Sequence, residues 1–505
     1  TAPSVPQPQQ AVLVSPASDP ATVTAAEPAA DAVSATPTET AIQRPSAAAR
    51  DPAPGHAPPP QHAPAPQAVP GTRLLLRRRR RVIAAGVAAV VVLAAAAVAG
   101  WLAVSSGSAA SPWTAARAPL PAGAAVGKDQ LAWLRGVACP AAGNCVAVGW
   151  YYVASGPVPL IETLSGGTWV ASGHVAGAPI DELLGVACPA QGSCVAAGWY
   201  LTAGILGPVV ATLSGGTWTA TDLPLPQGAD RSDYAQLYAI ACPAQGVCVA
   251  TGRDEAQNGH SRAFIETLSG GSWTAVWAPL PAGAAPSSAT TTAGAYLNSV
   301  TCPAAGSCVA VGMYTERGSS NTAVLIDTLS GGTWTAATAP LPADASADGQ
   351  SAGLSGISCQ TPGNCVAIGS YIGRGGARFL AETLSAGTWT AAAPPLPADA
   401  RAPQKGLTIL DSLACQEVGH CVAVGSYQAS SGAIDGAIDT LSGRAWTAAA
   451  APLPPGAATT SQLVLISQVV CPAPGYCIGV GRYHPEAAKD GNGQALIETA
   501  TGKHG

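Results

Sequence analysis

Short runs of alternating apolar and small polar residues, separated by turn-forming residues, fill the chain from about residue 113 to its end. In the first complete copy these runs are 134–138, 145–151, 159–164 and 168–172. Val, Ile, Leu and Trp alternate there with Ala, Thr and Ser, which predicts half-buried strands. No segment after residue 104 has the 3.6-residue apolar spacing of a helix. We therefore predict an all-β fold made of four-stranded antiparallel units.

The four-run unit recurs seven times, at intervals of 49 to 60 residues. Four antiparallel strands repeated at this period predict a seven-bladed β-propeller. Six copies end in a tryptophan five residues after the Leu-Ser turn begins, whereas the seventh ends at Thr501 without one. A Trp-Thr-Ala segment stands instead at Trp113. We expect the strand at 113–120 to be the outer strand of the last blade, so that the two chain ends close the ring.

All fourteen cysteines lie in these copies, two per copy and six positions apart. Each pair flanks a Pro, Ala and Gly-rich turn between two β runs, so a disulfide is expected to clamp each hairpin. Zinc would need four ligands at one point, and the histidines do not recur with the copies. The predicted disulfide cysteines are Cys139 with Cys145, Cys188 with Cys194, Cys242 with Cys248, Cys302 with Cys308, Cys359 with Cys365, Cys415 with Cys421, and Cys471 with Cys477.

The chain before the repeats has a different composition. A Pro/Ala-rich tract is followed by an arginine cluster and then by 23 uncharged residues, enough to cross a bilayer as a helix. A cleaved signal peptide is the alternative, but its apolar core is normally about 7 to 15 residues long. The predicted organisation is 1–72 disordered cytoplasmic tether, 73–81 basic segment, 82–104 transmembrane helix, 105–112 linker, 113–501 propeller and 502–505 tail.

This order predicts a single-pass type II protein of the cell membrane. The arginine cluster should stay in the cytoplasm, which places the N-terminus inside and the propeller outside the cell. The membrane is therefore one predicted partner. Only 10% of the residues are charged and the net charge is −5, so the chain has no basic face and we expect no nucleic-acid binding.

The turn T-L-S-G-G-T-W resembles the Asp-box of sialidase-like (BNR-like) propellers. Aligned on Gly166, Thr168 and Trp169, the Asp of the family falls on Leu164 and its Ser on Glu162. The C-P-x-x-G-x-C-V-A-V-G run also resembles extracytoplasmic propellers of high-GC bacteria. Some of those are joined through a Pro-rich tether and one membrane helix to a cytoplasmic Ser/Thr kinase. The resemblance implies a propeller over 113–501 and a sensor role for it.

A carboxylate stands two residues before the Leu-Ser turn in six copies. Repetition around a ring separates these groups, whereas acid and base catalysis needs two carboxylates facing one bond. We expect them to be structural and to accept hydrogen bonds from turn amides or from hydroxyls such as Ser165 and Thr168. The six are Glu162, Glu266, Asp327, Glu382, Asp439 and Glu498, with Ala211 in the second copy.

No catalytic constellation, metal site or cofactor motif is recognised, so we predict neither an enzyme nor a cofactor. The variable residues after the second strand are the candidate ligand face, because departures from a repeat are where a site can lie without harming the scaffold. The predicted ligand is a cell-envelope glycan, a peptide or a surface protein; a glycoside-processing enzyme and a scaffold without small ligand are the alternatives. The candidate residues are Trp150, Trp199, Arg253, Arg262, Arg317, Arg374 and Arg482.

Overall fold

A computed structural model describes residues 112–230, 233–257, 259–285, 294–347, 350–401, 407–459, 462–486 and 493–502. They all belong to the second of two compact units, 105–505. The predicted tether, basic segment and transmembrane span, and all but the last residue of the linker, lie outside the described residues.

The predicted localisation is corrected. A membrane span needs a helix of about 20 apolar residues, and among the described residues no helix is long and apolar enough to cross a bilayer. These residues form strands and one short 3-10 helix, η1 (Gly127–Asp129). The structure therefore gives no support to a single-pass anchor at 82–104.

The first copy folds into four consecutive antiparallel strands, as its alternating pattern predicts. They are β2 (Ala132–Ala141), β3 (Asn144–Val153), β4 (Gly156–Ser165) and β5 (Thr168–Ser172). The outer strand β5 is short, and every second residue in it is exposed. One face of each sheet is therefore left to pack against a neighbour.

The later copies repeat this plan, and β1 (Trp113–Arg117) precedes them all. Their strands are β6 (Ala176–Gly177), β7 (Glu182–Ala190), β8 (Ser193–Thr202), β9 (Ile205–Ser214), β10 (Thr217–Asp222), β11 (Tyr234–Ala244), β12 (Val247–Glu255), β13 (Ser261–Ser269), β14 (Ser272–Trp277), β15 (Ala295–Ala304), β16 (Ser307–Thr315), β17 (Thr322–Ser330), β18 (Thr333–Ala337), β19 (Ala352–Thr361), β20 (Asn364–Gly373), β21 (Gly376–Ser385), β22 (Thr388–Ala392), β23 (Thr408–Glu417), β24 (His420–Gln428), β25 (Ile434–Ser442), β26 (Ala445–Ala450), β27 (Val464–Ala473), β28 (Tyr476–Tyr483) and β29 (Gln494–Thr501).

Within the described residues these strands form five four-stranded sheets and one nine-stranded sheet. The nine-stranded sheet contains two four-stranded antiparallel runs, β7 to β10 and β11 to β14, which a single parallel pairing of Tyr234 with Leu206 connects. Strand β6 adds to its edge beside β10. The fold is therefore all-β and propeller-like, built from four-stranded antiparallel sheets.

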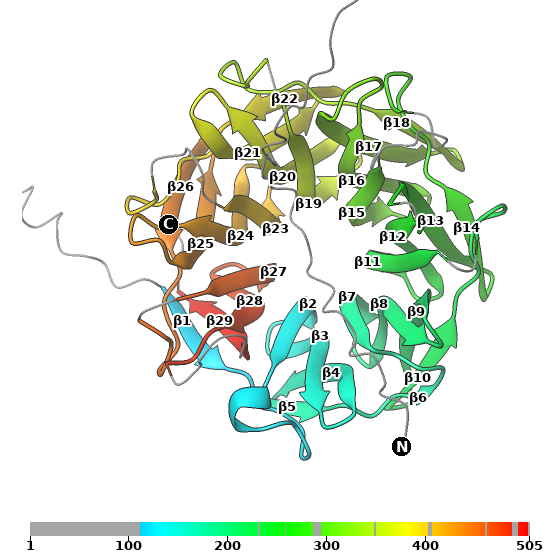
Figure 1. Ribbon diagram of the computed structural model, residues 1–505, viewed down its shortest axis with the longest axis vertical. Coiled ribbons are helices and arrows are strands. Elements are labelled where there is room, and N and C mark those ends of the chain that lie inside the picture. The colour runs from blue at the N-terminus through cyan, green and yellow to red at the C-terminus, as the bar shows by residue number, and fades with distance from the viewer. Residues whose placement is uncertain are drawn as a thin grey trace, which may run out of the picture. The chain divides into compact units, whose positions relative to one another are not determined.

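The first strand of each copy contacts the first strand of the next, and β27 contacts β2. Figure 1 shows β2, β7, β11, β15, β19, β23 and β27 nearest the centre of this unit. The hydrophobic core lies between the sheets, because each buried cluster combines residues of two neighbouring copies. One cluster packs Ile478 and Val480 of the last copy against Leu134 and Leu160 of the first.

The last sheet takes its outer strand from the other end of the described chain. Strand β1 pairs antiparallel with β29, with Trp113 opposite Ala500 and Arg117 opposite Leu496. Trp113 is 5% exposed and packs in the cluster that contains Ile466. The circle of sheets is thus closed by the pairing that the displaced Trp-Thr-Ala segment predicts.

Two turns define each copy. The first joins the first two strands and is clamped by the predicted disulfide, which forms in all seven copies. In the chain-entropy model a loop of this size contributes about 2 to 2.5 kcal/mol. The second turn, Gly166-Gly167, has φ angles of 58° and 81°. Two successive positive φ values are the signature of the two-residue hairpin turn that favours glycine.

The repeated tyrosines at the end of the second strand are buried between sheets. Tyr371, Tyr427 and Tyr483 are at most 1% exposed. The phenol of Tyr371 donates to Asp344 Oδ1 at 2.6 Å, and that of Tyr427 donates to Asp399 Oδ1 at 2.7 Å. The hydroxyls of Tyr371 and Tyr427 are therefore satisfied by the loop that leads into their own copy, whereas Tyr483 donates to Gln494 Oε1 on β29 at 2.8 Å.

The six repeated carboxyl groups differ from the prediction. All are fully buried, as a structural role requires, but none of their oxygens has a hydrogen-bond partner. Glu162 lies in the middle of β4 between Ala147 and Ala171, while the turn hydroxyls of Ser165 and Thr168 belong to exposed residues. The predicted hydrogen bonds are therefore wrong, because these side chains are enclosed between small residues rather than directed at the turn.

Burial without partners favours the neutral acid. Desolvation raises the pKa of Glu162, Glu266 and Glu382 from 4.5 to about 8, and that of Glu498 to about 9. The same cause raises the pKa of Asp327 and Asp439 from 3.8 to about 8. At neutral pH these six groups are mostly protonated.

We expect Trp113→Ala to lower the free energy of unfolding by about 3 to 5 kcal/mol, because it removes a large buried side chain from the strand that closes the ring. Val170→Ala, at a 62% exposed position on the outer strand β5, should change it by less than about 0.5 kcal/mol. Urea titration of the full chain measures both. Equal effects of the two substitutions would show that β1 does not contribute to closure.

We also expect stability to fall as pH rises from about 5 to 9. The folded-state pKa of each of the six buried carboxyls is raised, so the folded protein binds more protons than the unfolded chain between the two pKa values. Their stabilisation is complete below about pH 4, near the unfolded pKa, and is lost as pH rises through 8 to 9.

Glu498→Gln tests this linkage, because the amide has nearly the shape of the protonated acid but cannot ionise. The variant should unfold like the wild type at pH 5 and become progressively more stable than it towards pH 9. Glu417→Gln, at an exposed position, is the matched control and should not change the slope. Parallel melting-temperature profiles for Glu498→Gln and wild type between pH 5 and 9 would disprove the linkage.

Candidate functional site

Every first strand carries a β-bulge at the same place, one residue beyond a buried leucine or isoleucine. A bulge leaves one residue outside the ladder and turns its side chain to a new direction. The first strands lie nearest the centre of the unit (Figure 1), so the bulged residues are candidates to face the axis. They are Arg135, Leu184, Tyr238, Asn298, Ser355, Asp411 and Ser467.

Charged side chains from distant copies interact near the bulged residues of the first strands. Arg135 of the first copy interacts electrostatically with Glu182 of the second, Tyr238 of the third and Asp411 of the sixth. Side chains from such different copies can interact only if they converge on the axis. Arg482 of the seventh copy joins them, because it interacts with Arg135 and Glu182. We call Trp133, Arg135, Glu182, Tyr238, Asp411 and Arg482 the axial cluster.

Trp133 is the aromatic centre of the axial cluster. The guanidinium of Arg135 lies 4.2 Å from its ring centroid and that of Arg482 lies 3.9 Å from it. The indole N–H of Trp133 donates to Ser467 Oγ at 2.8 Å, and Trp150 packs edge-on at 6.4 Å between centroids. The two arginines are therefore held by a platform that is itself fixed on both sides.

The charged groups of the axial cluster do not neutralise one another directly. Among the described residues, the ion pairs are those of Arg253, Arg262 and Arg378, and none includes Arg135, Glu182, Asp411 or Arg482. The Nε of Arg482 is buried and has no hydrogen-bond partner. A buried donor without an acceptor is uncommon and needs a reason, such as a ligand that supplies the acceptor.

Burial shifts the pKa values in the axial cluster. Desolvation raises the pKa of Glu182 to about 7, although Arg135 acts against this shift. The pKa of Asp411 is also raised to about 7 by desolvation, again opposed by Arg135. Desolvation and the nearby Arg135 lower the pKa of Arg482 to about 10. Desolvation thus opposes the ionisation of both carboxyls, and an added positive charge would favour their ionised forms.

The third copy extends the polar surface around the axis. Arg253 forms an ion pair with Glu255 at 2.7 Å and lies 5.0 Å from the ring centroid of Tyr296. The phenol of Tyr238 donates to Gln236 Oε1 at 3.1 Å, and desolvation raises the pKa of Tyr238 to about 12. Tyr238 is therefore a neutral hydrogen-bonding group at physiological pH.

The structure brings four of the seven predicted face residues to the neighbourhood of the axial cluster. Arg482 belongs to it, Trp150 packs on Trp133, and Trp199 hydrogen-bonds the carboxylate of Glu182. Arg253 is coupled electrostatically to Tyr238. Each of these four residues lies on the second strand of its copy and pairs with a residue near the start of the first strand. They lie at the end of the sheet where the chain turns from the second strand into the third.

The other three predicted residues, Arg317, Arg374 and Arg262, lie outside the axial cluster. Arg317 is exposed, and its guanidinium donates to the carbonyl oxygens of Ala282 and Ala284, which holds a loop. Arg374 is exposed on a hairpin, where its backbone N–H donates to the carbonyl of Asp344.

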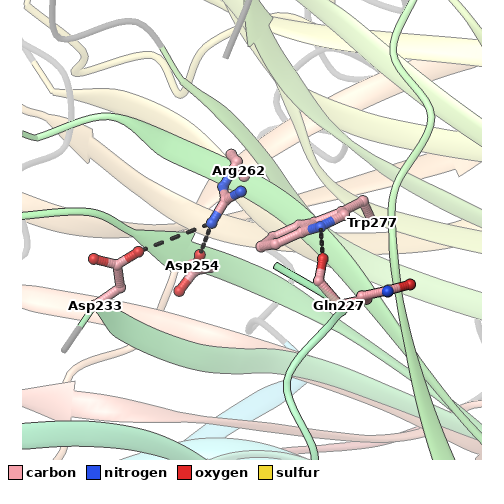
Figure 2. A network of polar contacts seen from close by, with 5 residues as sticks. All are labelled: Gln227, Asp233, Asp254, Arg262 and Trp277. Atoms are coloured by element: carbon pink, nitrogen blue, oxygen red, sulfur yellow. Dashed lines mark hydrogen bonds and ion pairs between the residues drawn. The ribbon is translucent and has the colours of Figure 1, made fainter. Parts of the chain in front are cut away.

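Arg262 is held in a network within the third copy, shown in Figure 2. Its guanidinium lies 2.8 Å from Asp254 Oδ2 and 3.9 Å from Asp233 Oδ2, and it stacks 3.7 Å from the ring centroid of Trp277. Trp277 in turn donates to the carbonyl of Gln227 at 3.0 Å. The carboxylate of Asp254 is fully buried, so the role of Arg262 is to neutralise it.

A surface hollow of about 540 Å³ lies elsewhere, between β1, β29 and the β4–β5 turn. Arg117 is the charged residue of its lining, with Trp169, Leu120 and Pro119 among the apolar residues. One charge among apolar groups in an open hollow provides little to orient a ligand. The convergent polar groups are those of the axial cluster, and we regard that cluster as the candidate site.

The sequence analysis did not select Trp133, Arg135, Glu182, Tyr238 or Asp411. A signal was present, because the residues on both sides of the constant leucine in the first strand differ from copy to copy. Arg135 is the charged residue of a strand that is otherwise apolar, and Asp411 directly follows the apolar pair Ile409 and Leu410. The residues predicted from the sequence lie on or after the second strand of their copies. They therefore include Arg482 but no residue of the first strand.

Within the described residues no group of three or more His, Cys, Asp or Glu side chains could hold a metal ion. The axial cluster offers charge, hydrogen bonds and aromatic contact. The arrangement combines two guanidiniums and two carboxyls around one indole.

No protein-family model matches the chain, and no curated protein matches it. Solved structures with a related fold include a protein of unknown function from Dyadobacter fermentans, 12% identical, covering 77% of this chain and 99% of that one with a TM-score of 0.42. The Trypanosoma rangeli sialidase in complex with 2,3-difluorosialic acid is 10% identical, over 62% of this chain and 52% of that one, with a TM-score of 0.37.

An α-L-arabinofuranosidase from Fusarium graminearum is 9% identical, over 76% of this chain and 97% of that one, with a TM-score of 0.37. Sialidase-like and other propeller-type folds are therefore among the structural neighbours. At these identities and TM-scores the likeness concerns the class of fold alone.

We expect Arg262→Ala to lower the free energy of unfolding by on the order of 2 kcal/mol, because it leaves the buried carboxylate of Asp254 without its counter-charge. Arg374→Ala removes an exposed arginine from the equivalent hairpin of another copy and should change it by less than about 0.5 kcal/mol. Adding Asp254→Asn to Arg262→Ala should recover part of the loss. Urea denaturation measures all three, and equal losses for both single arginine variants would contradict the assigned role.

Proposed function

We propose that the protein is a binding module and that the axial cluster holds an anionic group of its ligand through Arg135 and Arg482. The observation that carries this proposal is the buried Nε of Arg482, which has no acceptor although the side chain is fixed against Trp133. A ligand carboxylate would supply the missing acceptor and would also reduce the repulsion between the two guanidiniums.

The geometry of the platform supports this assignment. The indole of Trp133 is fixed by Ser467 and packs against Trp150, so the guanidiniums stacked on it lose little freedom on binding. Arginine donors arranged in this way suit a planar carboxylate better than a spherical ion. Trp199 and Arg253, at the edge of the axial cluster, would contact the remainder of a larger ligand.

We further infer that the chain forms seven blades, one for each sequence copy. The two four-stranded runs of the nine-stranded sheet then count as separate blades, because one pairing alone connects their strands directly. A blade for each copy places one bulged residue of every copy around the axis, which is the arrangement that the site requires. The sensor role implied by the family resemblance stays a prediction.

The test is binding of N-acetylglycine, a small carboxylate without an amine, to the full chain by isothermal titration calorimetry. We expect weak binding that Arg482→Gln lowers about tenfold to a hundredfold, since a charge-assisted hydrogen bond is removed. Arg374→Gln is the matched control, because Arg374 is an exposed arginine outside the axial cluster, and it should bind like the wild type. Absence of binding by the wild type, or equal affinity in Arg482→Gln, would refute the proposal.

A further inference from the structure

The proposed anion explains neither acidic residue of the axial cluster; Glu182 is hydrogen-bonded by Trp199, which leaves Asp411. It is the bulged residue of β23, and the bulged residues of the neighbouring first strands β19 and β27 are Ser355 and Ser467. Neither neighbour offers a positive charge. The cation that acts on Asp411 is Arg135, two copies away around the ring, and no ion pair joins them within the described residues.

Asp411 differs from the six repeated carboxyls in one respect that matters for binding. Those six are completely enclosed between small residues and no ligand can reach them. Asp411 is only partly buried, in a strand that lines the centre of the unit. Because Arg135 also interacts electrostatically with Asp411, a ligand group held by Arg135 would come within the electrostatic range of Asp411.

The charges of the axial cluster are balanced but separated. Arg135 and Arg482 come from the adjoining first and seventh copies and share Trp133, whereas Asp411 stands on the sixth copy. A purely anionic ligand would bring its charge towards Asp411 and Glu182, and a purely cationic one would meet two guanidiniums. A ligand with both charges can place its negative group on the two arginines and its positive group on Asp411. Such a match of opposite potentials favours a partner that carries both signs.

We propose that the ligand is a zwitterion of the peptide class, with its carboxylate on Arg135 and Arg482 and its ammonium group on Asp411. This inference rests on the proposed function and adds the second charge to it. The ammonium group supplies three donors to a carboxyl group that accepts no hydrogen bond from the described residues. Glu182 is already hydrogen-bonded by Trp199 and is the less available of the two carboxyls.

Glycylglycine and N-acetylglycine form a matched pair of probes, since they differ only by the ammonium group. We expect the full chain to bind glycylglycine about tenfold to a hundredfold more tightly than N-acetylglycine, as one charge-assisted interaction is added. Asp411→Asn should abolish this preference and leave the affinity for N-acetylglycine unchanged or slightly improved. Asp411→Glu, which keeps the charge, should retain a preference for glycylglycine.

The outcomes separate this inference from the proposed function. Equal affinity of the wild type for both probes, or a preference that persists in Asp411→Asn, overturns the zwitterion while leaving the anion site in place. Failure of both probes to bind overturns both proposals. The probe comparison in the wild type needs no variant, so it remains decisive even if Asp411→Asn does not fold, and thermal melting of each variant shows whether it does.

Discussion

The pairing of β1 with β29 is the interaction on which the ring of sheets depends. A four-stranded sheet with one apolar face is stable only when a neighbour covers it, and in a row of such sheets the first and last would each leave a face exposed. Here the first and last copies cover each other, through a cluster that joins Leu134 and Leu160 to Ile478 and Val480. That contact requires the last sheet to be complete, and its outer strand comes from Trp113 to Arg117.

Closure has a second consequence, because it brings the first strands of all copies around a common axis. Each of these strands has the same bulge, so every copy offers one side chain that is free of the ladder. The bulge occurs in every copy, but the residue type at the bulged position differs from copy to copy. Arg135 and Asp411 use it for charge, Tyr238 for a hydroxyl and Leu184 for an apolar group.

Two kinds of buried carboxyl illustrate how position decides chemistry. Glu162 and its five equivalents lie between alanine or glycine neighbours, have no partner and are kept neutral by desolvation, so they act as part of the packing. Glu182 and Asp411 are also desolvated, but Arg135 lies near enough to both to act against the rise in their pKa. The first kind links stability to pH, and the second belongs to the proposed ligand site. Composition alone does not separate them, because both are acidic residues in strands made largely of apolar and small residues.

The sequence by itself determined the elements and the covalent clamps. Alternation of apolar and small polar residues has a period of two wherever a strand is half-buried, and paired cysteines six residues apart can reach each other across one turn. The displaced Trp-Thr-Ala segment was likewise enough to locate the strand that completes the last sheet. The single-pass anchor, by contrast, is not supported by the described residues, and the expected hydrogen bonds of Glu162 are absent. Only the tertiary structure decided that Arg135, Glu182, Asp411 and Arg482 belong to one cluster, because these residues are separated by up to several hundred positions and come together only when the ring closes. A local pattern records which neighbours a residue has along its strand, but not which side chains it faces across the axis.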